Sequence, residues 1–191
     1  MTNQPTIVKV VGPLVVAKGM KHAKMNEVVR VSKEKLVGEV IELHGDEGSI
    51  QVYEETAGVG PGEPVELTGA TLSVELAPGL LEQFYDGIQR PLKLIEEKAK
   101  SQYITRGIEA PGLDRDRKWD FEAIASSGDE VAEGDILGTV QETTLIEHKV
   151  MVPPGKGGTL KDIKSGSFTI EDTIATIKVD GKDEDIQMLQ K

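Results

Sequence analysis

Several kinds of residue are absent or scarce in this 191-residue sequence, and each absence removes a class of function. There is no cysteine, which excludes disulfides, iron–sulfur clusters and thiol catalysis. The three histidines, His22, His44 and His148, lie far apart and lack the spacing of metal ligands, so no zinc or iron site is expected. Aromatic residues make up 4% of the chain, and we expect the single tryptophan, Trp119, to pack in a core.

Long apolar runs and positive charge are scarce as well. No stretch approaches the roughly 20 apolar residues that span a bilayer, and residues 1–6 lack the apolar centre of a signal peptide. The net charge of −11 argues against a nucleic-acid partner, because affinity for phosphates comes from Lys and Arg. The sequence therefore predicts a cytoplasmic protein that does not insert into a membrane directly.

Motifs for phosphate chemistry or hydrolysis are missing too. The phosphate loop, Gly-x-x-x-x-Gly-Lys-Ser/Thr, does not occur, and its nearest approach, residues 155–158, predicts a plain turn because no hydroxyl residue follows Lys156. No Gly-x-Ser-x-Gly elbow is found. The adjacent acids at 54–55, 96–97 and 183–185 indicate solvated charge. We expect no catalytic residue, no cofactor-binding residue and no metal ligand in this chain.

What the sequence does contain is many short strands punctuated by 21 glycines and nine prolines. In the first third, runs rich in β-branched residues cover residues 7–11, 14–17, 27–31, 36–43 and 49–54. The last run alternates polar and apolar residues, which places Ile50 and Val52 on a buried face. Short strands at this spacing predict a small closed β-barrel.

Residues 78–100 are the one stretch with helical spacing. An apolar stripe is formed by Leu80, Leu81, Phe84, Tyr85 and Ile88, and Pro91 is expected to restart the helix. We expect Leu80, Leu81, Phe84 and Ile88 of this stripe to be exposed and to favour self-association. Residues 101–118 carry no apolar period and predict an irregular connection.

Residues 119–189 return to strands and contain a weak internal repeat. Residues 127–140 and 165–177 each combine a Ser-Gly turn, an acidic turn and an alternating strand. Trp119, Phe121 and Ala123 alternate onto one face. Two such β units around a hairpin resemble the barrel-sandwich hybrid of biotinyl and lipoyl carrier domains. A carrier needs a lysine at the hairpin tip, and residues 141–147 contain none, so a swinging-arm role is disfavoured.

Several segments together resemble one particular family. Their order and spacing are similar to those of the catalytic A subunit of archaeal A-type and vacuolar V-type rotary ATPases, and the resemblance covers essentially the whole chain. The segments are residues 12–15, 38–41, 50–58, 60–65, 72–81, 85–92 and 148–154. One departure is Ala77, where the family usually has glycine.

The resemblance implies a mainly β fold in three parts. Residues 1–76 would form the N-terminal β-barrel, residues 77–110 the helical start of the nucleotide-binding domain, and residues 111–191 the bulge insertion with a return strand. In the family, the phosphate loop and the catalytic glutamate follow the position matching Lys191. We therefore expect this chain alone to be inactive, since ATP and Mg would bind the full subunit.

The resemblance also implies partners. The full subunit would join B subunits in a hexamer of three A and three B, with central and peripheral stalks, and would couple ATP synthesis or hydrolysis to proton or sodium transport. The barrel would serve assembly and the bulge would serve stator or regulatory contacts. The alternatives are a stand-alone, non-catalytic β interaction module and, less favoured, a biotin- or lipoyl-type carrier.

Overall fold

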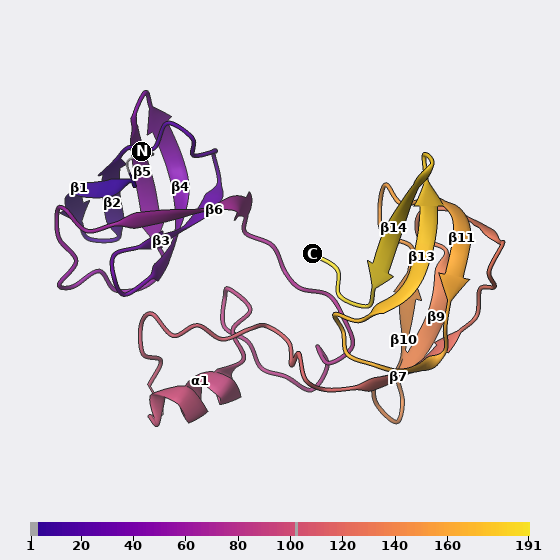
Figure 1. Ribbon diagram of the computed structural model, residues 1–191. Helices are drawn as coiled ribbons and strands as arrows, with labels where there is room; N and C mark the ends of the chain where they lie inside the picture. The colour runs from indigo at the N-terminus through magenta and orange to yellow at the C-terminus, as the bar shows by residue number, and fades with distance from the viewer. Residues whose placement is uncertain (1–3, 102) are drawn as a thin grey trace. The chain divides into compact units, whose positions relative to one another are not determined.

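The chain folds into two compact units, each described here by itself. A computed structural model describes residues 4–101 and 103–191. Met1–Ser73 and Leu92–Ala110 form the first unit, here called the barrel unit. Val74–Pro91 and Pro111–Lys191 form the second, here called the sandwich unit (Figure 1). The predicted middle part, residues 77–110, is therefore shared between the two units, and its place in a nucleotide-binding domain stays a prediction.

The barrel unit contains one six-stranded antiparallel sheet in the order β1-β2-β5-β4-β3-β6. Its strands are β1 (Thr6–Val11), β2 (Leu14–Lys18), β3 (Glu27–Val31), β4 (Leu36–His44), β5 (Glu47–Val52) and β6 (Val65–Thr71). The segment that leads into β6 closes the sheet against β1. Ile7 N–H donates to Glu63 O at 2.8 Å, and Gly62 N–H donates to Ile7 O at 2.8 Å. Closure leaves no long unpaired edge, as a small barrel requires.

The barrel core lies where the strand alternation places it. Ile50 and Val52 are buried, which confirms the predicted face. They share the interior with Ile7, Val15, Ala17, Met20, Val29, Val31, Leu36, Val40 and Val65. Burial of each Val, Ile or Leu side chain contributes about 1.5–3 kcal/mol.

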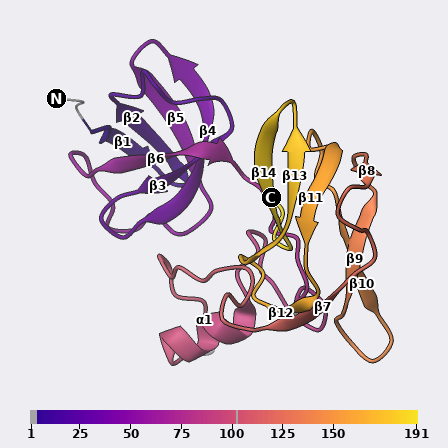
Figure 2. The ribbon, with the colours of Figure 1, turned by 45° about the vertical axis from the view of Figure 1, so that its right-hand side comes forward.

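The sandwich unit has two four-stranded sheets, in the orders β10-β9-β7-β12 and β14-β13-β11-β8. The strands are β7 (Trp119–Ala123), β8 (Glu130–Val131), β9 (Ile136–Gln141), β10 (Glu147–Met151), β11 (Gly158–Ile163), β12 (Gly166–Phe168), β13 (Thr173–Val179) and β14 (Lys182–Gln187). The two orders correspond strand by strand: β10, β9 and β7 of the first sheet match β14, β13 and β11 of the second, and β12 matches β8. The two halves of the unit are thus equivalent, and each half crosses from one sheet to the other; Figure 2 shows the short strands β8 and β12.

The internal repeat of the sequence is a structural repeat with matching turns. Ala132 N–H donates to Asp135 Oδ2 at 2.7 Å, between β8 and β9. At the equivalent place between β12 and β13, Thr169 N–H donates to Asp172 Oδ2, also at 2.7 Å. An aspartate that caps its own turn in this way fixes the chain reversal.

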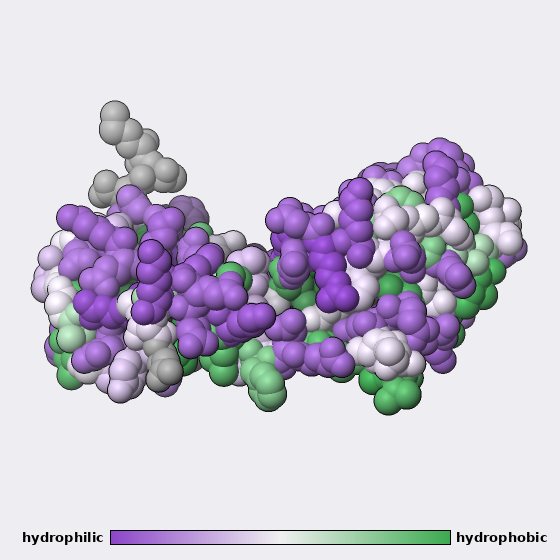
Figure 3. Space-filling model, turned by 90° about the horizontal axis from the view of Figure 1, so that it is seen from below, coloured by the Kyte–Doolittle hydropathy of each residue, from purple (hydrophilic) through white to green (hydrophobic). Residues whose placement is uncertain are grey.

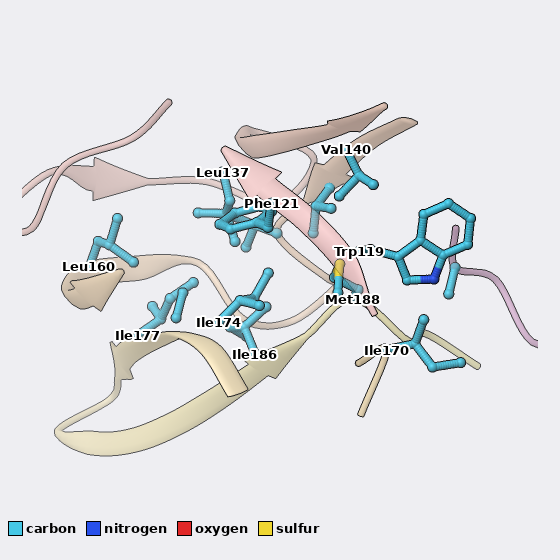
Figure 4. Close-up of a cluster of buried hydrophobic side chains, with 14 of the residues drawn as sticks. Trp119, Phe121, Leu137, Val140, Leu160, Ile170, Ile174, Ile177, Ile186 and Met188 are labelled. Carbon is cyan, nitrogen blue, oxygen red and sulfur yellow. The ribbon is translucent and has the colours of Figure 1, made fainter. Parts of the chain in front are cut away.

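The space between the two sheets is filled by aliphatic side chains around Trp119 and Phe121. Both aromatic residues are buried and Ala123 is partly buried on the same face, which confirms the predicted alternation. Figure 4 shows Phe121, Leu137 and Val140 together with Ile174, Ile177 and Ile186 of the other sheet. The core is thus built from both halves of the repeat.

The predicted helix over residues 78–100 is wrong in its first half. Only α1 (Leu92–Ala99) is helical, with Ile95 as its buried residue. Residues 78–91 form turns, irregular chain and one isolated bridge between Tyr85 and Pro91, and Glu82 and Gln89 have φ angles of 65° and 60°. Pro91 lacks an N–H and ends any helix before it, and left-handed residues cannot lie inside one. The connection over residues 103–118 is irregular, as predicted.

None of the helices in the described parts of the chain is long and apolar enough to cross a membrane.

Candidate functional site

The Gly-Lys cluster that comes nearest to a phosphate loop is a turn followed by a strand. Residues 154–155 form the turn, and β11 begins at Gly158 where a phosphate loop would need a helix. Lys156 Nζ lies 3.4 Å from Glu184 Oε2, so the lysine is engaged within the unit. Nothing in this geometry favours phosphate binding.

The histidines do not converge. His44 Nε2 lies 2.8 Å from Glu42 Oε1 on an exposed part of the barrel unit, while His22 is exposed and His148 lies on β10 of the sandwich unit. Among residues 4–101 and 103–191, no group of three or more His, Cys, Asp or Glu side chains could hold a metal ion.

The adjacent acids are used separately. Glu54 accepts hydrogen bonds from the N–H groups of Val37 (3.1 Å) and Gly107 (3.2 Å), whereas Glu55 is exposed. On β14, Asp183 pairs with Lys161 at 2.5 Å and Asp185 accepts from Thr176 Oγ1 at 3.1 Å. Glu54, Asp183 and Asp185 each bind a separate partner, so these three carboxylates do not form a shared site for acid–base chemistry.

The tip of the β9–β10 hairpin carries an apolar side chain where a carrier would need lysine. Leu145 is 91% exposed at this tip, and Ile146 is 46% exposed. Lys149 lies on β10 opposite Thr139 of β9, away from the tip. The described tip thus presents Leu145 and Ile146 to solvent, and Lys149 lies along the strand.

The most buried acid of the sandwich unit is Glu142, at the base of this tip. Its side chain is 4% exposed. One carboxylate oxygen, Oε1, accepts the N–H groups of Gly79 (2.7 Å) and Leu81 (3.0 Å). The other, Oε2, lies 3.5 Å from His148 Nδ1. No sequence motif marks Glu142, because its partners are backbone groups more than 60 residues away.

The charge of Glu142 acts on two neighbours. Burial lowers the pKa of His148, although the Glu142 carboxylate opposes this shift, so the ring is neutral at pH 7. Burial also raises the pKa of Tyr85, and the charges of Glu142 and Glu75 add to the effect. The Tyr85 hydroxyl therefore keeps its proton. Glu142, His148 and Tyr85 thus form a cluster in which the hydrogen bonds of Glu142 stabilise the fold.

A second polar cluster surrounds Glu75. Burial alone would raise its pKa, but hydrogen bonds and charges from Lys191 and Arg115 lower it overall. Arg115 Nη2 lies 2.6 Å from Glu75 Oε2, and Lys191 Nζ lies 2.9 Å from Glu75 Oε1. The Gln89 side chain exchanges two hydrogen bonds with the Glu75 backbone, at 2.6 and 2.7 Å. The cluster joins residues 74–91 to the rest of the sandwich unit.

The barrel unit has an anchor that the sequence did not reveal. Arg106 forms an ion pair with Glu34 at 2.7 Å and donates to the carbonyl oxygen of Ala57. Gly107 has a φ of +71°, and a Cβ there would collide with the carbonyl oxygen of Glu34. These contacts hold the segment after α1 on the barrel, which explains why residues 92–110 belong to this unit.

One end of the barrel exposes apolar side chains around the Gly12-Pro13 turn. Val11 and Leu14 are paired across the turn and are 54% and 36% exposed. Val52 N–H donates to Pro13 O at 2.8 Å, which brings the next residue, Tyr53, beside the turn. The Tyr53 side chain is 41% exposed. We call Val11, Leu14 and Tyr53 the barrel-end patch. Figure 3 shows hydrophilic residues over much of the visible surface, with hydrophobic ones in scattered patches. Such exposed apolar and aromatic groups suit protein contact better than catalysis.

Comparison with known proteins matches both units to one family. Residues 7–69 match the model described as "ATP synthase alpha/beta family, beta-barrel domain". Residues 110–191 match the model described as "ATPsynthase alpha/beta subunit barrel-sandwich domain". The two matches together cover most of the chain.

Individual relatives agree with these matches. The chain is 58% identical to a "V-type ATP synthase alpha chain" of Acetivibrio thermocellus over 190 residues, which is 99% of this chain and 32% of the relative. It is also 58% identical to the A subunit of an A-type ATP synthase of Methanococcus maripaludis over 185 residues, 97% of this chain and 32% of the relative. The chain thus spans about a third of the length of these relatives. It belongs to the ATP synthase alpha/beta family and is similar to an N-terminal region of the A-type and V-type A subunits, with a β-barrel domain and a barrel-sandwich domain.

Proposed function

We propose that this chain supplies the assembly and contact region of the A subunit of an ion-translocating A/V-type ATP synthase. The observation that carries the proposal is the 58% identity to such subunits across 99% of the chain, which includes both units. The barrel unit would bind neighbouring B subunits in a hexamer of three A and three B. The sandwich unit would bind stalk or regulatory subunits. The protein would then be cytoplasmic and peripheral to the membrane through its complex.

Catalysis in this proposal belongs to the full subunit, which would bind ATP and Mg and couple ATP turnover to proton or sodium transport. The described residues support this division, because their buried acids and bases are committed to backbone groups or to ion pairs of their own unit. The purified chain is expected to show no ATP turnover above background and no heat of ATP binding in calorimetry. Turnover that scales with chain concentration would contradict the proposal.

Binding through the barrel is tested on the barrel-end patch. Leu14→Asp places a charge among exposed apolar groups, and a desolvated charge without a partner opposes association. We expect this variant to lose binding to a B-type subunit in sedimentation, while Thr71→Asp, exposed on β6 outside the patch, keeps it. Equal binding by both variants would remove the patch from the proposed interface.

A further inference from the structure

Residues 77–85 of the sandwich unit form a segment with no helix and no strand of its own, here called the strap. Ala77 is fully buried in the sandwich core, and Leu80 packs partly against it. Gly79 lies against Trp119, since a Cβ at this glycine would be 3.2 Å from Trp119 Cζ2. The strap therefore covers one edge of the core that Trp119 occupies.

The middle of the strap is held by a single side chain. Glu142 Oε1 accepts both the Gly79 N–H at 2.7 Å and the Leu81 N–H at 3.0 Å. Among the described residues, these are the hydrogen bonds that those two amides make. A charged acceptor forms stronger hydrogen bonds than a neutral one, so the carboxylate contributes much of the attachment.

The backbone that carries Glu142 is fixed by hydrogen bonds within its own hairpin. Glu142 N–H donates to Ile146 O at 3.1 Å across the hairpin, and the Thr143 hydroxyl accepts the N–H of Ile146 at 3.1 Å. Gln141 Nε2 also donates to Thr143 O at 2.5 Å. These hydrogen bonds restrain the backbone that carries Glu142, which lowers the conformational entropy lost when the carboxylate binds the two amides.

The closed strap also has weak points. Phe84 is 80% exposed and Leu81 is 40% exposed, so neither side chain adds much apolar burial. The Tyr85 hydroxyl is buried, yet it has no hydrogen-bond partner among the residues that the structure describes. A segment with few buried contacts and an unpaired polar group has low local stability and is expected to open before its sheet does.

We propose that Glu142 is the latch of this strap, and that residues 77–85 open as a unit while both sheets of the sandwich stay folded. Opening exposes Ala77, Leu80 and the covered edge of Trp119. The inference rests on the contacts of the sandwich unit alone and does not depend on the proposed ATP synthase function.

Hydrogen exchange of the full 191-residue chain tests the latch, with NMR detection at single amides. Glu142→Gln keeps the size of the side chain and removes its charge. We expect the amides of Gly79 and Leu81 to exchange at least about tenfold faster in this variant. Amides of β9 and β13 should keep their protection. Glu147→Gln, exposed on the same hairpin, is the matched control and should change neither set.

Two results would overturn the latch. Unchanged exchange at Gly79 and Leu81 in Glu142→Gln would show that the carboxylate does not hold the strap. Equal acceleration in β9 and β13 would show that Glu142 supports the whole unit. The unsubstituted chain gives an independent measurement: in low urea, exchange of the strap amides should be nearly independent of urea concentration, whereas exchange of β13 amides should accelerate with it. A common urea dependence would contradict a separate opening.

Discussion

Glu27 is buried at 2% exposure in the barrel unit, where its carboxylate connects two separate pieces of backbone. Its Oε2 accepts the Lys24 N–H at 2.8 Å, and its Oε1 accepts the Gly69 N–H at 2.6 Å. The residue therefore holds the loop before β3 against β6. A lone acid at the start of a strand carries no sequence signal for such a role, which is why only the structure reveals it.

Replacing this carboxylate tests its contribution to stability. Glu27→Ala leaves two backbone N–H groups without their charged acceptor, and we expect a loss of about 2–3 kcal/mol in the free energy of unfolding of the barrel unit. Urea denaturation followed by far-UV circular dichroism measures the change. Glu47→Ala, at an exposed position on β5, is the control and should stay within about 0.5 kcal/mol. Similar losses in the two variants would contradict the assigned role.

Tyr53 gives a pH-dependent prediction. Its hydroxyl donates a hydrogen bond to Glu39, and this bond, with smaller effects of burial and of the Glu39 charge, raises its pKa from 10.0 to about 12. Because the folded pKa is the higher one, the stabilisation is complete below pH 10 and is lost as the pH rises from 10 to 12.

Ultraviolet absorption of tyrosinate measures this shift directly. The difference between the titrations of the unsubstituted chain and Tyr53→Phe should show one tyrosine that ionises near pH 12. The stability of the unsubstituted barrel should also decline more between pH 10 and 12 than that of the variant. A difference titration centred near pH 10 would mean that the Glu39 hydrogen bond does not persist in solution.

At the scale of elements, the sequence predicted strands better than it predicted the helix. Alternation identified the buried faces of β5 and β7 because one face of each strand packs on a core. The apolar spacing over residues 78–88 has a different origin. Of that stripe, Leu80 packs partly on the sandwich core, whereas Leu81 and Phe84 are exposed, so the apolar spacing does not correspond to one buried face. The left-handed backbone of Glu82 and Gln89 excludes the helix there, which an apolar count does not register, whereas α1 begins directly after Pro91.

The two matching turns of the sandwich repeat give an element-scale prediction. Asp135→Ala and Asp172→Ala each remove a side-chain acceptor from the equivalent turn, so both variants should lower the melting temperature of the sandwich unit by similar amounts. The intrinsic fluorescence of Trp119 follows this unfolding. Glu133→Ala, exposed within the first turn, should leave the melting temperature unchanged. A loss in only one aspartate variant would show that the halves of the repeat are not equivalent in stability.

For the whole molecule, the motifs were sufficient to identify the family but not the division into units. The carrier-like repeat predicted the sandwich, and the short strands predicted the barrel. The return of residues 92–110 to the barrel unit depends on Arg106 and Gly107. Their partners, Glu34 and Ala57, lie far away in the sequence. Long-range contacts of this kind follow from packing, and no local pattern encodes them.

The two hydrophobic cores share no residue, which leads to a prediction for the whole chain. Ile177→Ala, in the sandwich core, should cost about 2–5 kcal/mol and shift the unfolding transition reported by Trp119. Ile50→Ala, in the barrel core, should destabilise the barrel by a similar amount and leave the Trp119 transition in place. Urea titrations of the two variants by fluorescence measure this. A shift of the Trp119 midpoint in Ile50→Ala would show that the two units unfold together.

The central claim is that both units perform the contact functions of the A-type and V-type relatives. A chimeric subunit tests it most directly. The chain would replace the matching region of the Acetivibrio thermocellus "V-type ATP synthase alpha chain", to which it is 58% identical. ATP hydrolysis by the purified complex would then be measured. We predict that the chimera assembles and hydrolyses ATP at a rate of the same order as the parent complex. A folded chimera that fails to join its partner subunits would contradict the account.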